Sequence, residues 1–369
     1  MKGQAELKRV ELKRVESVRT ALDRVGFLDA DGAYFLVDGQ YGSTGKGLVA
    51  GLIASLFPGK IDYVTSNAGP NSGHTSYRGG KKIVLKQLPT ASVHLALMGR
   101  YVPTYLNAGA VIDPRTLFDE QDEYGVNLRV SPTAAIVAPH HKLAEGADIQ
   151  TRIGSTSKGT GAALAEKIMR VPTAVAQGWY EPYKARPFRL GNLPMGGLGD
   201  KRGFVEVSQG HSLGINQGFY PYCTSRDCTV AQAMSDAGLH PSLYRDSISV
   251  FRTYPIRVGG DSGGCYPDQE ETTWGEIGQS PEYTTVTNKE RRVFTWSDMQ
   301  FQEAIARNRS GVIFMNFMNY LPPVKHAGFL MHAHELYREV MGHYPKATLI
   351  GHGPNSADIE AVTAQISRP

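Results

Sequence analysis

Short apolar runs alternate with amphipathic stretches along most of the chain. The run AYFLVDG at 33–39 predicts a buried strand, and KGLVAGLIASLF at 46–57 predicts a helix that ends before a Pro-Gly pair. Further helices are expected at 297–308 and 333–344, between strands at 82–88, 109–112, 173–177, 203–210, 248–259, 311–321 and 347–354. This alternation predicts an α/β fold with a mostly parallel central sheet flanked by helices. Ligands of such sheets bind at the carboxyl ends of the strands.

The first thirty residues contain a direct repeat of Glu-Leu-Lys-Arg-Val, at 6–10 and 11–15. Apolar residues recur there at roughly helical spacing, which predicts an amphipathic helix with a solvated charged face rather than a nucleic-acid-binding segment. No low-complexity linker interrupts the remainder of the chain. We therefore expect a helical extension at 1–30, followed by a single catalytic domain at 31–369.

The composition is that of an ordinary globular protein, with 41% hydrophobic residues, 20% charged residues and a formal net charge of +4. This mild basic excess suits small anionic substrates and is too small to favour nucleic-acid wrapping. The cysteines Cys223, Cys228 and Cys265 lack the spacing and partners of a disulfide framework or a zinc site. Because no apolar run has the length of a membrane span or the form of a signal peptide, we expect a reduced, cytoplasmic protein.

A glycine-rich turn, GQYGSTGKG at 39–47, separates the first strand from the first helix. It is not a P-loop, because Gly39 stands one residue too far back and Gly47 follows Lys46 where a hydroxyl would bind magnesium. Free backbone N–H groups at a helix start bind anions, and a lysine adds a charge for phosphate oxygens. The turn therefore predicts a phosphate site of unusual shape, although Gly45 and Gly47 could also serve turn geometry alone.

A second polar loop, NAGPNSGHTSY at 67–77, adds Asn71, Gly73, His74 and Thr75. A histidine in a glycine-bordered polar loop is expected to face a ligand rather than to lie in the core. A protonated imidazole beside a phosphoryl group in transfer would stabilise the negative charge on its oxygens. The two segments together indicate phosphoryl-transfer chemistry.

Collinear segments between residues 37 and 354 resemble motifs of the adenylosuccinate synthetase family. In chain order they are DGQYGSTGKG, NSGHT, IGSTSKGTGAALAEKIMR at 153–170, SQGHSLGINQGFYPYCTS at 208–225, IRVGGDSG, EYTTVTNKERR at 282–292 and GHGP at 351–354. The resemblance covers most of the chain. It implies that family's fold, which is related to the P-loop NTPases, together with Mg²⁺ as cofactor and a homodimeric assembly.

The family's reaction has two steps. The oxygen on C6 of a purine is first phosphorylated by a nucleoside triphosphate, and the amino group of L-aspartate then displaces phosphate. By resemblance, the catalytic residues are Ser43, Lys46 and His74, with His74 stabilising the transferring phosphoryl group. The donor's phosphates are expected at Ser43, Thr44, Gly45, Lys46, Gly47 and Thr75, and magnesium at Ser43 and the carbonyl of Gly73.

The resemblance also implies the contacts of the acceptor nucleotide: Ser43, Asn71, Ser155, Thr156, Arg170, Gln209 and Thr224. Arg170 matches an arginine that reaches the 5′-phosphate across the dimer interface of the family. From the residues alone, Ser155 and Thr156 could equally be helix caps, and Arg170 a solvated charge.

The first departure from the family concerns the acceptor. Ser43 stands where the family has a catalytic aspartate that removes the proton from purine N1. A serine is a poor base near neutral pH, but its small hydroxyl leaves space for a 2-amino group and can accept a hydrogen bond from it. The departure therefore favours a guanine nucleotide as acceptor, with a phosphate oxygen, water or Ser43 itself taking the N1 proton.

The second departure concerns the donor. The family reads the guanine of GTP with an aspartate in a TKLD segment, where this chain has NFMNY with Asn316 and Asn319. An amide carries both a donor and an acceptor, which suits adenine. Gly353 and Pro354 are followed by Asn355, where the family has an aspartate. We therefore expect ATP or dATP as the donor.

The third departure lies in the segment that binds L-aspartate, where we expect Thr287, Lys289 and Arg291. Lys289 replaces the family's first arginine and offers only a point charge. Arg291 keeps its place and can hold a carboxylate with two parallel hydrogen bonds.

These departures match a divergent viral branch of the family. We expect a ligase that condenses dGMP with L-aspartate to N6-succino-2-amino-2'-deoxyadenylate, for 2-aminoadenine nucleotide synthesis in the host cytoplasm. We expect neither nucleic acid nor membrane as a partner. The alternatives are an ordinary adenylosuccinate synthetase that uses IMP and GTP, and an inactive nucleotide-binding protein that has lost its general base.

Overall fold

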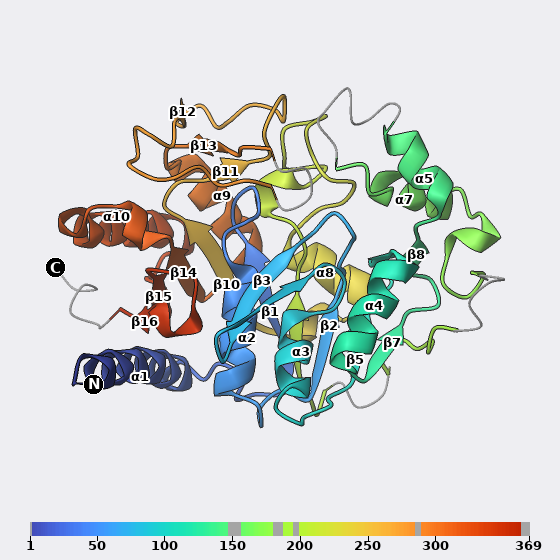
Figure 1. Cartoon of the computed structure of the whole chain (residues 1–369), viewed down its shortest axis with the longest axis horizontal. Helices are drawn as coiled ribbons and strands as arrows, with labels where there is room; N and C mark the ends of the chain where they lie inside the picture. Colours follow the sequence, from blue (N-terminus) through green and yellow to red (C-terminus); the bar gives the residue numbers. More distant parts are fainter. Residues whose placement is uncertain (1, 147–155, 180–186, 195–198, 285–288, 363–369) are drawn as a thin grey trace.

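A nine-stranded sheet runs through the middle of the molecule in this computed structural model, which describes residues 2–146, 156–179, 187–194, 199–284 and 289–362 (Figure 1). The strand order is β16-β15-β14-β10-β1-β9-β2-β5-β7, and every neighbouring pair is parallel except β15 with β16. The strands are β1 (Gly32–Asp38), β2 (Tyr63–Ser66), β5 (Thr104–Leu106), β7 (Leu128–Val130), β9 (Arg202–Glu206), β10 (Tyr244–Arg252), β14 (Val312–Asn316), β15 (Ala347–Gly351) and β16 (Ile359–Ala361).

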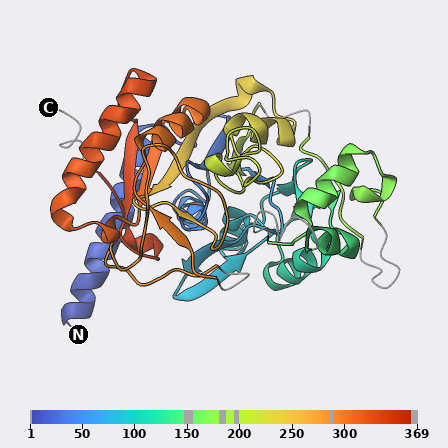
Figure 2. The same ribbon diagram turned by 90° about the horizontal axis from the view of Figure 1, so that it is seen from above.

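Helices cover both faces of this sheet (Figures 1 and 2). One face carries α1 (Lys2–Arg24), α2 (Lys46–Leu56) and α3 (Thr90–Ala96), and the other carries α8 (Val230–Ala237), α9 (Asp298–Asn308) and α10 (Pro323–Met341). The central strand β1 explains this arrangement. Its residues Tyr34 and Leu36 pack toward α2, whereas Phe35 and Val37 pack toward α8, and all seven residues of the strand are buried. The predicted α/β class and mostly parallel sheet are confirmed.

Shorter elements flank the carboxyl edge of the sheet and its β7 end. They are the hairpin β3 (His74–Arg78) and β4 (Lys81–Leu85), the pair β6 (Val111–Ile112) and β8 (Ala135–Ile136), and the three-stranded sheet of β11 (Ile256–Arg257), β12 (Glu271–Thr272) and β13 (Arg292–Phe294). Within the described residues, the other α-helices are α4 (Pro114–Tyr124), α5 (Pro139–Ala144) and α7 (Thr160–Ile168). Within the described ranges, none of the helices combines the length and the apolar character that a membrane crossing needs.

The N-terminal helix α1 is tied to the body of the molecule through its second half. Val18 and Leu22 are fully buried in the core beneath α2, and the backbone N–H of Ala361 on β16 donates to Ser17 Oγ at 3.0 Å. The repeat therefore continues into a helix whose apolar face belongs to the main core. The division into an extension at 1–30 and a catalytic domain at 31–369 stays a prediction.

Two local predictions were wrong. The segment 173–177 is not a strand: a 3₁₀ turn occupies Pro172–Ala174, and a single bridge joins Val175 to Ala135. Proline fixes φ and donates no hydrogen bond, so it favours a turn over a sheet ladder here. His74 does not lie in a loop but begins β3, where it and Ser76 point inward while Thr75 points outward.

Candidate active site

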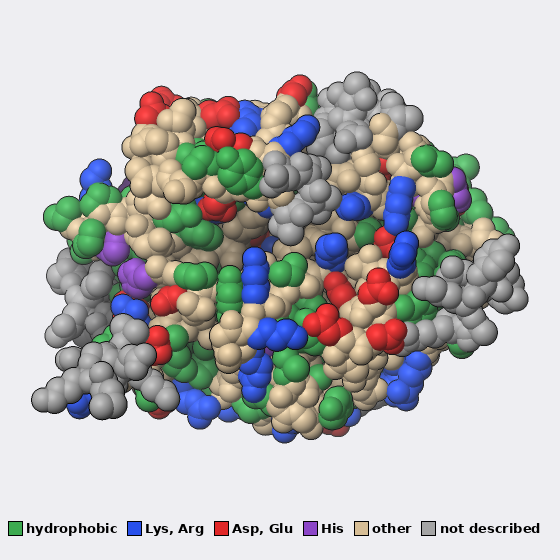
Figure 3. Space-filling view, in the orientation of Figure 1, with side chains coloured by type: hydrophobic (Ala, Val, Ile, Leu, Met, Phe, Trp, Pro, Cys, Tyr) green, Lys and Arg blue, Asp and Glu red, His purple; other side chains and the backbone are tan. Residues whose placement is uncertain are grey.

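A large pocket lies where the carboxyl ends of the central strands meet the β3–β4 hairpin and the small sheet that contains β11. Its volume is about 930 Å³. Figure 3 shows the hollow near the middle of this face, with lysine and arginine side chains around it. This is the edge at which parallel sheets bind ligands, and the size suits nucleotides.

Most of the residues predicted from the sequence line this one pocket, although they come from segments far apart in the chain. They are Ser43, Thr44, Gly45, Lys46, Gly47, Asn71, Gly73, His74, Thr75, Thr156, Gln209, Thr224, Lys289, Arg291, Asn316, Asn319, Gly353 and Pro354. Ser155 and Thr287 lie outside the described residues. Arg170 is exposed just after α7 and is absent from the pocket lining of a single chain.

Asp38, at the end of β1, holds the glycine-rich turn at 39–47, called the phosphate turn below. Its role was not predicted from the sequence. Its buried carboxylate accepts hydrogen bonds from the backbone N–H groups of Gln40 at 2.9 Å and Gly42 at 3.2 Å, and from Thr44 Oγ1 at 2.5 Å. Lys46 Nζ lies 3.3 Å from Asp38 Oδ2. The only sequence signal was a polar residue that directly follows a buried apolar run.

Lys46 has a second partner besides Asp38. Its ammonium also donates to the backbone carbonyl of Gln209 at 2.5 Å, and its side chain is 7% exposed. An ammonium has three N–H donors, so these two partners leave one for a ligand in the pocket. The lysine is thus fixed in place before any phosphate binds.

Ser43 forms the tip of the turn. Its backbone adopts φ 56°, in the left-handed region, and its side chain is exposed at the pocket wall. A non-glycine residue in this region is uncommon and is often found at functional sites. The conformation presents a small hydroxyl at the position where the family motif has a carboxylate.

Gly47 allows the start of α2 to approach β3. A Cβ atom at this position would lie 2.8 Å from the carbonyl oxygen of Thr75 and 3.1 Å from Cβ of His74. Only glycine fits such a close approach, so Gly47 brings the phosphate turn and the His74 segment together.

His74 begins β3 and is 9% exposed at the pocket wall. Burial, with a further contribution from the charge of Lys46, lowers the pKa of His74 to about 3. The expectation of a protonated imidazole concerned the ring beside a phosphoryl group, whose negative charge would favour protonation, and it stays a prediction. A neutral imidazole is favoured, because a second positive charge beside Lys46 would be poorly solvated there.

Asn316, expected to contact the donor base, has another structural task. Its Nδ2 donates to the carbonyl of Thr44 at 2.8 Å and its Oδ1 accepts from the N–H of Phe317 at 2.9 Å. It is buried and ties β14 to the phosphate turn. Asn319 is exposed at the pocket wall and remains the candidate for reading the base.

The segment expected to hold L-aspartate contributes Lys289 and Arg291. The backbone of Lys289 exchanges hydrogen bonds with Thr284, and the N–H of Arg291 donates to the carbonyl of Glu282 at 2.8 Å. Both cationic residues line the pocket, together with Glu282. This part of the pocket wall is therefore suited to a carboxylate ligand.

The oxygen atoms of the turn and its neighbours are the candidate ligands of a divalent cation. Ser43 and Gly73 line the pocket, whereas Asp38 is about 1% exposed and already accepts several hydrogen bonds. Neutral oxygens of this kind fit Mg²⁺ when substrate phosphates supply the negative ligands.

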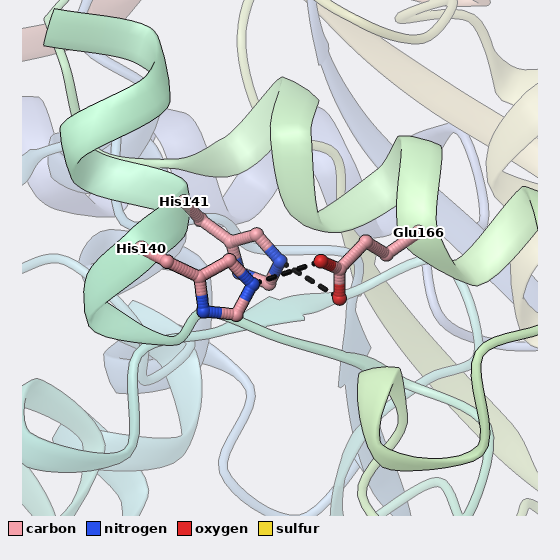
Figure 4. Close-up of side chains that lie close together, drawn as sticks. All are labelled: His140, His141 and Glu166. Atoms are coloured by element: carbon pink, nitrogen blue, oxygen red, sulfur yellow. Dashed lines mark hydrogen bonds and ion pairs between the residues drawn. The ribbon is translucent and has the colours of Figure 1, made fainter.

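A second group of potential metal ligands lies outside the pocket, where His140 and His141 of α5 face Glu166 of α7 (Figure 4). Glu166 Oε1 lies 2.8 Å from His140 Nε2, and Glu166 Oε2 lies 3.0 Å from His141 Nε2. His141 Nδ1 accepts the backbone N–H of Ala138 at 2.9 Å, so the proton of the neutral ring is on Nε2, toward Glu166. This arrangement joins two helices and disfavours a metal ion, which would need Nε2 without its proton.

Comparisons with known proteins show what the chain as a whole is similar to. Residues 35–181 and 198–326 match the family model described as adenylosuccinate synthetase. The chain is 38% identical over 341 residues to the N6-succino-2-amino-2'-deoxyadenylate synthase of Vibrio phage phiVC8, covering 88% of this chain and 96% of that protein. It is 36% identical over 367 residues to the enzyme of the same name from cyanophage S-2L, covering 90% and 96%.

A solved structure is similar as well. The succinoaminodeoxyadenylate synthetase (PurZ) of cyanophage S-2L, bound to dGMP and dATP as an energy donor, superposes with a TM-score of 0.77 at 34% identity. The match covers 90% of this chain and 95% of that chain.

Proposed function

The chain belongs to the adenylosuccinate synthetase family, and we propose that it condenses dGMP with L-aspartate, with ATP or dATP as phosphoryl donor. The product is N6-succino-2-amino-2'-deoxyadenylate, the compound that gives the phage relatives their name. The observation that carries this proposal is the exposed hydroxyl of Ser43 at the tip of the phosphate turn.

Ser43 distinguishes this proposal from an ordinary adenylosuccinate synthetase. A carboxylate at this position would take the N1 proton of IMP, which has only hydrogen on C2. On a guanine ring, the same carboxylate would crowd the 2-amino group, whereas a hydroxyl leaves room and accepts a hydrogen bond from it. The loss of the carboxylate is thus an adaptation to guanine rather than a loss of activity.

The reaction proceeds in two displacements. The O6 atom of guanine attacks the γ-phosphorus, the bond to the bridging oxygen breaks, ADP or dADP leaves, and the N1 proton passes to a phosphate oxygen, to water or to Ser43. The amino group of L-aspartate then attacks C6, and the C6–O bond breaks to release inorganic phosphate. The first step turns the C6 oxygen, a poor leaving group, into a phosphate ester that the amine can displace in the second step.

Lys46 and His74 act on the charge that moves during the first step. Lys46, fixed by Asp38 and Gln209, directs its remaining N–H donor to the donor's phosphates. The neutral imidazole of His74 donates a hydrogen bond to the transferring group, and the negative charge that the phosphates bring favours its protonation as phosphate becomes the leaving group.

Mg²⁺ belongs to this proposal, with Ser43 and the carbonyl of Gly73 as protein contacts beside the phosphate oxygens. When bound, it neutralises charge on the donor's phosphates. The protein contributes a preformed turn that leaves the phosphates, rather than a protein carboxylate, as the anionic ligands.

The remaining subsites follow the pocket lining. Asn71, Thr156, Gln209 and Thr224 contact dGMP, while Thr44, Gly45, Gly47, Thr75, Asn319, Gly353 and Pro354 contact the donor. Arg291 and Lys289 bind L-aspartate. Arg170 completes the 5′-phosphate site of a second copy in a homodimer, which accounts for its position outside the pocket of its own chain.

One assay tests this function. The purified protein is supplied with Mg²⁺ and L-aspartate, and dGMP, GMP or IMP is combined with ATP, dATP or GTP while phosphate release and product mass are measured. We expect turnover with dGMP and an adenine donor. Turnover of IMP with GTP but not of dGMP would establish the ordinary synthetase, and binding of dGMP without turnover by any donor would establish the inactive protein.

A further inference from the structure

Arg252 ends β10 at a point where several parts of the pocket meet, yet the residue is fully buried. Its backbone is fixed to the phosphate turn by Gln40. The N–H of Arg252 donates to Gln40 Oε1 at 2.9 Å, and Gln40 Nε2 donates to the carbonyl of Arg252 at 3.1 Å. The turn that carries Lys46 therefore also fixes the backbone position from which the Arg252 side chain extends.

The guanidinium of Arg252 touches three segments. Nη1 donates to the carbonyl of Ser43 at 3.2 Å, and Nη2 donates to Glu282 Oε1 at 2.5 Å. The guanidinium carbon also lies 3.9 Å from the ring centre of Phe317, in the segment after β14 that leads to Asn319. Tyr320 from this segment donates to the same Glu282 oxygen at 3.0 Å.

Glu282 connects this junction to the predicted aspartate subsite. Its carboxylate pairs with Arg252 at 2.5 Å and is also influenced by the charge of Arg291, and its carbonyl accepts the N–H of Arg291 at 2.8 Å. Burial raises the pKa of Glu282, but the two arginines outweigh this and keep it below its usual range. Without the Glu282 carboxylate, the fully buried guanidinium of Arg252 would lose its counter-charge.

We propose that Arg252 is a positioning residue that, through Glu282, orients Arg291 for L-aspartate and couples this subsite to the donor side of the pocket. Arg252 itself touches no substrate, because its side chain is fully buried behind Ser43 and Phe317. The inference rests on the proposed function only in taking Arg291 as a ligand of the substrate's carboxylate. Its consequence is that L-aspartate and the triphosphate assist each other's binding.

The test compares Arg252→Met with the wild-type protein, with rates referred to the folded fraction. We expect KM for L-aspartate to rise about tenfold or more, the equivalent of one hydrogen-bonded charge contact, while KM for dGMP changes less than about twofold. Arg252→Lys should recover part of the aspartate affinity, since it keeps the charge but loses the planar fork.

Arg226→Met is the matched control, because Arg226 is also buried but donates to the carbonyls of Asn67 and Gly109, away from Glu282. This variant should lose stability without a selective rise in KM for L-aspartate. Glu282→Gln should reproduce the effect of Arg252→Met, and the double variant should be no worse than either single one. Additive losses in the double variant would overturn the proposal, and so would equal changes in KM for L-aspartate, dGMP and the triphosphate.

The proposed function and the positioning role of Arg252 can be refuted separately. L-aspartate is a substrate whether the acceptor is dGMP or IMP, so the KM comparison is made with whichever acceptor turns over. If neither does, the proposed function fails, and calorimetric titration of L-aspartate into wild-type protein and Arg252→Met decides the inference. Equal affinities in that titration would overturn it, and a loss confined to the variant would support it.

Discussion

Asp38 shows how one buried carboxylate can shape the glycine-rich turn that we propose as the phosphate site. The backbone N–H groups of Gln40 and Gly42, the hydroxyl of Thr44 and the ammonium of Lys46 all point to it. Each donor bound in this way fixes one part of the turn. Preformed donors need no reorganisation when charge develops in the transition state.

Replacing Asp38 by Asn tests this arrangement. The amide supplies one acceptor and places an N–H group near Lys46, which leaves the buried ammonium without its counter-charge. We expect a loss of about 3–5 kcal/mol in the free energy of unfolding, typical of a broken buried ion pair, and a clear rise in KM for the triphosphate. Urea unfolding and donor titration measure the two effects.

Asp246 offers a matched control for this prediction. It is also buried, pairs with Lys346 at 2.8 Å and accepts the N–H of Gly311. It lies near the amino ends of β1 and β10, whereas the pocket lies at the carboxyl ends of the strands. Asp246→Asn should destabilise the protein while leaving KM for the triphosphate unchanged. If both variants raise that KM equally, the turn-specific role of Asp38 is refuted.

At the scale of elements, the sequence predicted the strands and helices that carry strong periodicity. The run at 33–39 and the helix at 46–57 were found almost to the residue, because an unbroken apolar run and a glycine-rich start are local signals. The strand predicted at 82–88 corresponds to β4, whereas its partner β3 was missed because the residues of β3, His74–Arg78, are mostly polar. Its partner strand, not its own composition, makes it a strand.

The contact between α5 and α7 leads to a prediction about pH. His140 and His141 lower the pKa of Glu166 through hydrogen bonds, against a smaller opposing effect of burial. The stability from this carboxylate is present above the ordinary pKa of glutamate and is lost as pH falls through the lowered value. Because the group is partly exposed, we expect Glu166→Gln to cost only about 0.2–1 kcal/mol at neutral pH.

Urea unfolding of wild type and Glu166→Gln at pH 7 and pH 3.5 checks this. The gap between the two midpoints should narrow at the lower pH. Glu335→Gln, which removes an exposed pair with Arg338 on α10, serves as a surface control. A gap for Glu166→Gln that widens on acidification would contradict the assignment.

For the whole molecule, buried histidines determine how stability responds to acid. Burial lowers the pKa of His94 and of His211 to about 4. In the unfolded chain they would take up a proton near pH 6.5, so the unfolded state binds more protons between these values and stability falls as pH falls. Each such histidine contributes a loss of about 1.4 kcal/mol per pH unit in this window.

The urea midpoint of the wild-type protein should therefore decrease steadily from pH 7 to pH 5. His94 bonds to Ser76 at 3.0 Å beneath α2, so His94→Gln should flatten the profile even though it lowers stability at pH 7. A midpoint that is constant over this range would show that these rings do not stay neutral in the folded protein.

The site could be predicted from the sequence only where local motifs carried it. The turn at 41–47, His74 and Arg291 could be predicted because they stand in motifs of neighbouring residues, and all of them line the pocket. The roles of three other residues could not be predicted, namely Asp38, Arg252 and Glu282. These roles depend on contacts between distant segments, such as that between Arg252 and Gln40, which are 212 residues apart. The order of the strands brings these residues together, and no single segment records that order.

The central claim is that Ser43 admits the 2-amino group of guanine. The most direct measurement is kcat/KM for dGMP and for IMP in the wild-type protein, in Ser43→Asp and in the size control Ser43→Ala. We expect Ser43→Asp to lower the preference for dGMP over IMP by about tenfold or more, and Ser43→Ala to change it far less. An unchanged preference in Ser43→Asp would contradict the account.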